Sequence, residues 1–275
     1  MIKIFTSILS TFFVLIFLIQ TNVCDAQSIK RPRFNVGINL SPEAAQERWQ
    51  EFSNSKLGGD YCMLFEIKHR PRKSEETKYI GYMMGIERNG TVYTRIRVAP
   101  ASTPTKIQEY ILKNSPSVSE VWKFENTKFV QVPSKDWQQP MCDGLLYSPF
   151  DIPMPYKYWQ SKYVGVDRVG QAVHLYDLTS PEFPSKTVRI ALSRDFNAPS
   201  QIQIFGKDCY KTANLGSVKK VDGLWIMREA SIKDENSKDK DILRFTAACF
   251  KTNLPLAFFL PDAPKDVKLP VMKRL

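Results

Sequence analysis

The feature that most constrains the fold is an alternation of apolar and polar side chains on both sides of a tight-turn signal. Large apolar residues recur at every second position between residues 61 and 67 and again between residues 80 and 86. Asn89-Gly90 follows, and the alternation resumes over residues 92–98. Successive side chains of a strand point to opposite faces, and Asn-Gly supplies the positive φ angles of a two-residue hairpin turn. The pattern predicts antiparallel strand pairing.

The same rhythm continues along the chain and predicts about eleven strands in one unbroken series. Further hairpins are expected around Val169-Gly170 and around Val221-Asp222-Gly223, and residues 125–128 form a turn. No pattern of helical length separates the strands, so a parallel sheet built from strand-helix-strand units is not expected. The predicted fold class is mainly β, with all of residues 41–275 in a single domain.

One helix is predicted before the first strand. Ser41 can cap its free N–H groups, Pro42 suits the first helical position, and the following residues Ala45, Trp49 and Phe52 share one apolar face. We expect Gly58-Gly59 to end this helix.

Residues 133–160 interrupt the strand rhythm. This segment carries five prolines and many large apolar side chains, among them Phe150 and Trp159. It is too rich in proline for a central strand or a long helix, so short helical turns packed over the sheet are expected. The segment is either a lid over a cavity or a plain covering connection, and it is called the lid segment below.

The first 26 residues have the layout of a secretory signal peptide. Lys3 gives a positive start, residues 4–19 are nearly all apolar and carry no charge, and Cys24-Asp25-Ala26 offers small residues around a cleavage site. The apolar run is shorter than the ~20 residues that span a bilayer. We expect export, cleavage after Ala26, an exposed leader over residues 27–40, and no lipid anchor at Cys24.

The residue types offer little for catalysis. His69 and His174 are the only histidines, no Gly-x-Ser-x-Gly motif or Cys-x-x-Cys pair occurs, and no carboxylate pair is apparent. We therefore expect no enzyme, no cofactor and no metal site. Both histidines are interpreted as structural or solvated, with His69 at a solvated strand end. Four cysteines remain after signal removal and permit two disulfides, whose pairing the sequence leaves open: Cys62, Cys142, Cys209 and Cys249.

The formal net charge of +11 is spread along the chain rather than gathered in blocks. In an exported protein, such charge favours contact with anionic lipid or an acidic protein surface over nucleic acid. A solvated basic face that only aids solubility is the alternative interpretation. The protein is expected to be a monomer.

Three local motifs resemble the LolA-like outer-membrane lipoprotein-sorting proteins. Residues 144–152 with Trp159 are similar to the family's lid entry, which runs from a glycine to an acidic-apolar pair. Residues 220–228 resemble its Asp-Gly-x-Trp hairpin, and residues 250–261 contain its Leu-Pro-x-x-x-Phe-x-Pro ending. The resemblance implies a half-open antiparallel β-barrel with an N-terminal helix and a lid of short helices. It also implies a periplasmic carrier of lipid or lipoprotein acyl chains.

An apolar hollow under a lid is what such a carrier requires. Burying an acyl chain gains roughly 0.8 kcal/mol per CH₂. Methionine and aromatic side chains adapt well to flexible chains, and we expect the ligand-binding residues to be Met63, Phe65, Tyr82, Met84, Trp122, Phe124, Phe150, Trp159 and Trp225. The alternative is a periplasmic sensor or interaction module that docks an inner- or outer-membrane protein through a basic face.

Overall fold

The computed structural model describes residues 38–55, 58–206 and 209–275. The predicted signal peptide, Cys24 and most of the leader lie outside the described residues. Within them, one α-helix, α1 (Pro42–Ser53), precedes sixteen strands. Ser41 caps α1 by accepting a hydrogen bond from the amide of Ala44, as predicted. The helix ends at Ser53, earlier than expected, and the amide of the C-cap residue Asn54 closes the last turn on the carbonyl of Gln50.

The strands form one large antiparallel sheet. Its N-terminal half contains β1 (Asp60–Arg70), β2 (Thr77–Arg88), β3 (Thr91–Pro100), β4 (Gln108–Asn114), β5 (Ser119–Glu125) and β6 (Lys128–Gln131). Its C-terminal half contains β7 (Gln160–Val169), β8 (Gln171–Thr179), β9 (Lys186–Ser193), β10 (Pro199–Gly206), β11 (Cys209–Leu215), β14 (Glu229–Asp234) and β15 (Lys240–Thr252). A small separate sheet consists of β12 (Val218–Val221) and β13 (Leu224–Met227).

The predicted hairpin turns are confirmed. Asn89 and Gly90 both have positive φ, 53° and 75°, between β2 and β3. Gly170 has a φ of 67° between β7 and β8, and Asp222 and Gly223 have positive φ between β12 and β13. The strand count exceeds the predicted eleven partly because two long predicted runs each divide in two. At the first division the Gly216 amide donates to the Glu229 carbonyl at 2.8 Å, an approach that a side chain at residue 216 would crowd.

The order of the strands in space explains why the sheet stays open. The order runs β6-β5-β4-β3-β2-β1-β15-β14-β11-β10-β9-β8-β7, so β6 and β7 are the two edges. Among the described residues, strands of the two halves pair only where β1 pairs with β15, and this pairing is called the seam. The lid segment joins β6 to β7, and it therefore crosses from one edge of the sheet to the other. The half-open antiparallel β-barrel predicted from the sequence is confirmed.

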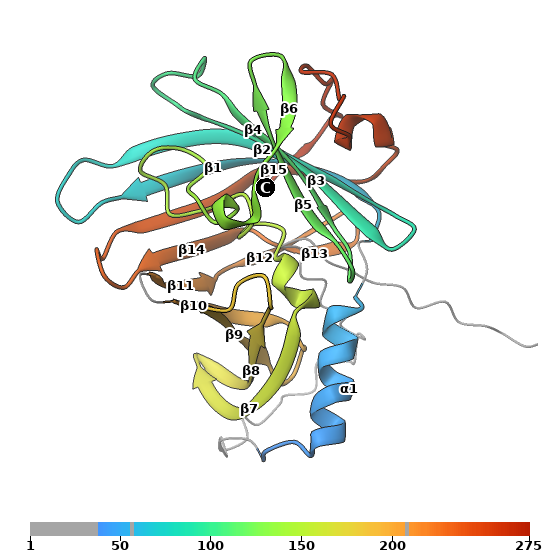
Figure 1. Ribbon diagram of the computed structural model, residues 1–275, viewed down its shortest axis with the longest axis vertical. Helices are drawn as coiled ribbons and strands as arrows, with labels where there is room; N and C mark the ends of the chain where they lie inside the picture. The colour runs from blue at the N-terminus through green and yellow to red at the C-terminus, as the bar shows by residue number, and fades with distance from the viewer. Residues whose placement is uncertain (1–37, 56–57, 207–208) are drawn as a thin grey trace, which may run out of the picture.

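The sheet has two covered faces. The lid face is packed against α1 and the lid segment, whose short helical turns are η1 (Ser134–Asp136) and η2 (Pro155–Tyr158). Helix α1 lies beside β7 and β8 (Figure 1), and the rings of Trp49 and Tyr176 are 5.1 Å apart.

The opposite face, here called the tail face, is covered by the C-terminal tail, residues 254–275. The tail contains the turn η3 (Leu256–Phe259) and the short strand β16 (Lys273–Arg274), which pairs with β15. The side chains of Leu254, Phe259 and Ala263 in this tail are buried. The tail thus provides a second apolar layer.

Arg95 fixes this tail to the sheet. Its side chain is fully buried, and its Nε donates to Glu109 at 2.8 Å. Its terminal nitrogens donate to the tail carbonyls of Phe258, Pro264 and Lys265. Each nitrogen of the buried guanidinium therefore has a partner, as burial of a charge requires.

Candidate functional site on the lid face

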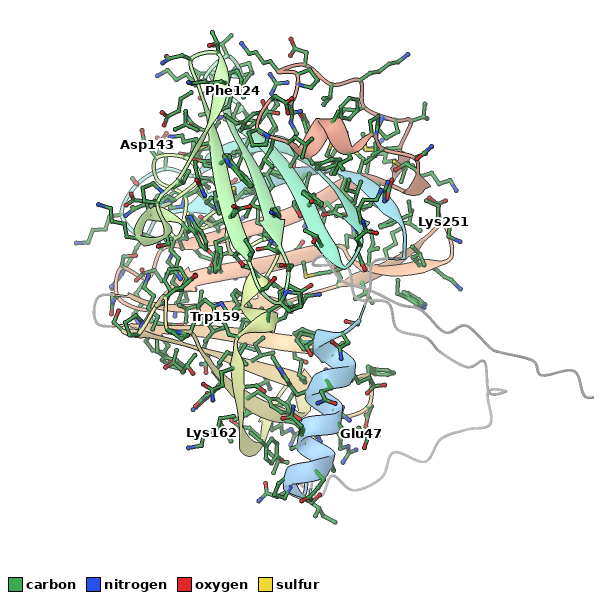
Figure 2. The ribbon with its side chains drawn as sticks, turned by 45° about the vertical axis from the view of Figure 1, so that its right-hand side comes forward. Glu47, Phe124, Asp143, Trp159, Lys162 and Lys251 are labelled. Carbon is green, nitrogen blue, oxygen red and sulfur yellow. The ribbon has the colours of Figure 1, made fainter. Side chains whose placement is uncertain are left out.

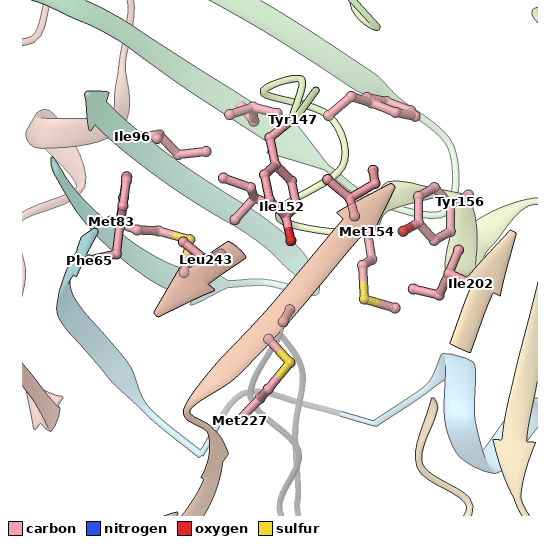
Figure 3. Packing of buried hydrophobic residues seen from close by; sticks show 14 of the residues in the cluster. Phe65, Met83, Ile96, Tyr147, Ile152, Met154, Tyr156, Ile202, Met227 and Leu243 are labelled. Carbon is pink, nitrogen blue, oxygen red and sulfur yellow. The ribbon is translucent and has the colours of Figure 1, made fainter. Parts of the chain in front are cut away.

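The lid segment buries its own apolar side chains against both halves of the sheet. Tyr147, Ile152, Met154 and Tyr156 belong to the same packed cluster as sheet residues that include Phe65, Met83, Ile96, Ile202 and Leu243 (Figure 3). The four lid side chains are at most 3% exposed. The apolar face of the sheet is thus filled by a segment that enters from one edge and leaves at the other.

An aromatic cluster forms the centre of this packing. Phe150 lies 5.5 Å from Trp137, 5.9 Å from Phe183 and 6.2 Å from Trp159, measured between ring centroids. Trp159 stacks on Phe183 at 5.4 Å. Ring pairs at these separations contribute about 0.5–1.5 kcal/mol each beyond the area that they bury.

One buried carboxylate holds the lid segment by its backbone. Asp241 of β15 accepts hydrogen bonds from the amides of Leu146 at 2.7 Å and Tyr147 at 3.3 Å through Oδ2. Its Oδ1 lies 2.7 Å from Nδ1 of His69 on the opposing position of β1. The side chain of Asp241 is fully buried, so these three partners replace its water. Asp241 and His69 are called the latch below.

Burial dominates the electrostatics around the latch. Loss of water raises the pKa of Asp241, and the bonds from His69 and the lid amides oppose that rise. Burial also raises the pKa of Tyr147 well above its ordinary value, with the charge of Asp241 adding to the effect. The latch is therefore a polar group in a dry apolar surrounding, where each unpaired donor or acceptor is costly.

Further polar contacts from the sheet converge on the same stretch of the lid segment. Lys211 Nζ donates to the Leu146 carbonyl at 2.7 Å, and the Tyr79 hydroxyl donates to the Asp143 carbonyl at 2.7 Å. The Tyr110 hydroxyl donates to the Met141 carbonyl at 3.1 Å. Residues 141–147 are thus fixed by hydrogen bonds, and residues 150–156 contribute large apolar side chains.

Three cavities lined by described residues lie around these faces. A cavity of about 530 Å³ lies beside the β12–β13 hairpin and the ends of β8 to β11, with Phe196, Val218 and Met227 in its wall. One of about 420 Å³ lies on the tail face between Leu64, Ile80, Tyr82 and the loop that carries Ile107. Both volumes fall in the range of about 300–1,000 Å³ typical of small-molecule sites.

The third cavity, of about 480 Å³, lies between α1 and the end of the lid segment, and Lys157 is in its wall. Lys157 is only 5% exposed, and its Nζ lies 4.8 Å from the ring centroid of Tyr158. Burial lowers the pKa of Lys157 to about 8, against an opposing effect of Glu87.

The nine expected ligand-binding residues do not share one cavity. Met63, Phe65 and Phe150 are in the lid-face core, and Trp159 packs against it. Four others lie on the tail face, where Tyr82 and Met84 join the cluster under the tail and Trp122 and Phe124 pack near Ala263. Trp225 is half-buried in β13, with Lys220 Nζ 6.0 Å from its ring. Figure 2 shows Phe124 at one end of the fold and Trp159 near its middle, above α1.

The register explains this division. Met63 of β1 pairs with Met83 of β2, and Cys62 pairs with Met84. Because side chains alternate, Met63 and Met84 lie on opposite faces. Whether any of the nine residues binds a ligand stays a prediction.

Two histidine interpretations have different outcomes. His174 is 2% exposed, and its Nδ1 lies 3.3 Å from the Tyr163 hydroxyl, in keeping with a structural role. His69 was expected to be solvated, and this was wrong, because it is 7% exposed and pairs with Asp241. Asp241 itself was not among the expected site residues, and it lies 172 residues away from its partner in the sequence.

The cysteines are unpaired where the structure describes their side chains. Cys62, Cys142 and Cys249 are free and buried. The side chain of Cys209 lies outside the described part. The two disulfides that the sequence permits are therefore not seen. No helix among the described residues is long and apolar enough to cross a membrane.

Comparisons with known proteins bear on the fold. No family model matches the chain, and no curated protein matches its sequence. Among solved structures, a domain from Vibrio parahaemolyticus described as an outer membrane lipoprotein-sorting protein is similar, with a TM-score of 0.65 at 14% identity. The match covers 79% of this chain and 94% of that one.

Two further solved structures are similar over comparable lengths. A DUF1329 family protein from Desulfovibrio piger has a TM-score of 0.66 at 12% identity, with 79% of this chain and 96% of that chain covered. A LolA superfamily protein from Nitrosomonas europaea has a TM-score of 0.61 at 13% identity, with 79% and 98% covered. The open sheet, its crossing lid segment and these likenesses together establish that the chain has a LolA-like fold.

Proposed function

We propose that the protein is an exported, periplasmic carrier that binds the acyl chains of lipids or lipoproteins on the lid face. The observation that carries this proposal is the covering of that face. A single segment that crosses from β6 to β7 covers the apolar sheet, together with α1, and among the described residues no second large sheet lies against it. Because a few hydrogen bonds and apolar contacts hold this segment, it can move off the sheet and an apolar ligand can take its place.

Replacement of the lid side chains by an acyl chain is energetically favourable, because apolar atoms take the place of apolar atoms. An acyl chain that replaces Phe150, Ile152 and Met154 keeps the sheet covered with apolar atoms and gains roughly 0.8 kcal/mol for each CH₂ that leaves water. The cost is the release of the lid segment, including its bonds to Asp241. The likeness to a LolA superfamily protein and to a lipoprotein-sorting domain supports this class of ligand.

A matched pair of variants tests the proposal. Phe150 on the lid face and Phe259 on the tail face are each 1% exposed, so their replacement by alanine removes the same ring from similar burial. The affinity for a fluorescent long-chain fatty acid is measured by titration. Phe150→Ala should tighten binding several-fold, because the ligand no longer displaces that ring, and Phe259→Ala should leave the affinity unchanged.

Lipid extraction provides a second readout. Protein purified from the exported fraction of its host should yield bound acyl lipids in extracts analysed by mass spectrometry. An empty extract together with no saturable binding of the probe rules out the carrier. Equal changes in both alanine variants would place the ligand away from the lid face.

A further inference from the structure

Two cysteines oppose each other at the seam. Cys62 of β1 and Cys249 of β15 are direct partners in the antiparallel ladder. Directly opposed residues in such a ladder have Cα atoms about 4.5–5.5 Å apart. This separation falls within the range of roughly 4.4–6.8 Å that disulfides span. The backbone therefore already has the spacing that a disulfide needs.

The two side chains also lie on the same face of the sheet, the tail face. Both belong to the buried tail-face cluster that contains Tyr82 and Met84. The Sγ of Cys249 lies 3.7 Å from the carbonyl oxygen of Cys62. Cys142, in contrast, belongs to the lid-face core on the other side of the sheet. Among the cysteines whose side chains are described, Cys62 and Cys249 alone share a face.

We propose that Cys62 and Cys249 form a disulfide that joins the two halves of the sheet at the seam. The oxidant is a small disulfide of the compartment, such as oxidised glutathione. One cysteine thiolate attacks it, forms a mixed disulfide and releases one thiol. The second cysteine thiolate then attacks the protein sulfur of the mixed disulfide and releases the second thiol. The protein loses two electrons and two protons, and the reagent becomes two thiols.

The surroundings determine when this bond forms. Burial, reinforced by the Cys249 thiol, raises the pKa of Cys62 to about 12, and burial also raises the pKa of Cys249. Few thiolates therefore exist once the tail has docked. The bond forms during folding, before the tail covers the seam, and it is shielded from reductants afterwards. It fixes the seam, so that opening of the protein is confined to the lid segment.

Peptide mapping tests the pairing directly. The full chain is reduced and denatured, refolded with reduced and oxidised glutathione, alkylated, and digested without reduction. The expected product is a peptide with Cys62 linked to a peptide with Cys249, about 2 Da lighter than the two thiol peptides. Recovery of both as alkylated free thiols, or linked to Cys142 or Cys209, would overturn the proposal.

Thermal unfolding gives an independent readout. A disulfide that closes so long a stretch of chain should raise the Tm of the oxidised protein by about 10 °C over the reduced protein. The difference should persist in Cys142→Ser, which removes another buried thiol, and vanish in the Cys62→Ser/Cys249→Ser double variant. If the oxidised and the reduced wild-type protein have the same Tm, the proposal is contradicted, even if the double variant fails to fold.

Discussion

Removal of the latch carboxylate should open the lid segment without unfolding the sheet. In Asp241→Ala, the amides of Leu146 and Tyr147 lose their acceptor while they stay buried. A buried donor without a partner costs about 1–3 kcal/mol, and the Tyr147 bond is long and therefore weak. The substitution also removes the desolvation cost that raises the pKa of Asp241. The closed position of the lid segment therefore loses about 2 kcal/mol of stability relative to the open one, which increases the population of the open lid about 30-fold.

Cys142 reports this opening. It lies in the lid segment, and burial raises its pKa to about 11, so the closed form reacts slowly with alkylating reagents. The protein is refolded and kept in a reductant, so that Cys62 and Cys249 are free thiols in every labelling experiment. Alkylation followed by peptide mass spectrometry then gives a rate for each cysteine. The rate at Cys142 should rise about 30-fold in Asp241→Ala, and the rates at Cys62 and Cys249 on the tail face should not change.

Asp177→Ala is the matched control. Asp177 pairs with Arg189 through both carboxylate oxygens within the sheet, at 2.7 and 2.9 Å, and neither bond involves the lid segment. Its removal should leave the Cys142 rate unaltered. An unchanged Cys142 rate in Asp241→Ala would refute the latch. Equal acceleration at all three cysteines would show global unfolding instead of lid opening.

Three further substitutions test other parts of the account. Arg95→Met leaves the buried Glu109 without its closest ion-pair partner and removes the donors to the tail carbonyls. The free energy of unfolding measured in urea should therefore fall by about 3–5 kcal/mol. Because the tail is loosened, Cys62 and Cys249 beneath it should be alkylated faster than Cys142. Burial lowers the pKa of Lys157 from its ordinary value of 10.5 to about 8 in the folded protein, so wild-type stability is lost as the pH falls through 8. Lys157→Met should therefore be more stable than the wild type by about 1–3 kcal/mol in urea unfolding at pH 7, and the difference should disappear near pH 10; a difference independent of pH would contradict this. In Gly85→Ala the new methyl group overlaps the fully buried Tyr61 ring, and calorimetry should show a loss of about 1–3 kcal/mol, whereas an unchanged Tm would mean that the ring moves aside.

Local patterns in the sequence predict the elements well because their causes are local. The Asn89-Gly90 turn needs only its own two residues to adopt positive φ, and the cap of α1 needs only Ser41 and the first turn. The short helical turns of the lid segment follow from its prolines, which exclude a central strand or a long helix. Such features depend on neighbours in the chain.

The candidate site depends on contacts between distant residues, which local patterns do not contain. The alternation showed that Met63 and Phe65 share a face, but no tight turn fixed the register between β1 and β2. Met84 was therefore grouped with them, although it pairs with Cys62 on the tail face. The latch joins β1 to β15, and nothing near His69 in the sequence indicates a buried carboxylate.

Acyl-chain affinity in Asp241→Ala tests the central claim most directly. If the ligand binds where the lid segment lies, only the open protein binds, and the apparent Kd equals the intrinsic Kd divided by the open fraction. The Kd for a fluorescent long-chain fatty acid should then fall by the same factor by which Cys142 labelling rises, about 30-fold. Faster labelling with an unchanged Kd, or with no binding at all, would contradict a carrier that holds its ligand beneath the lid.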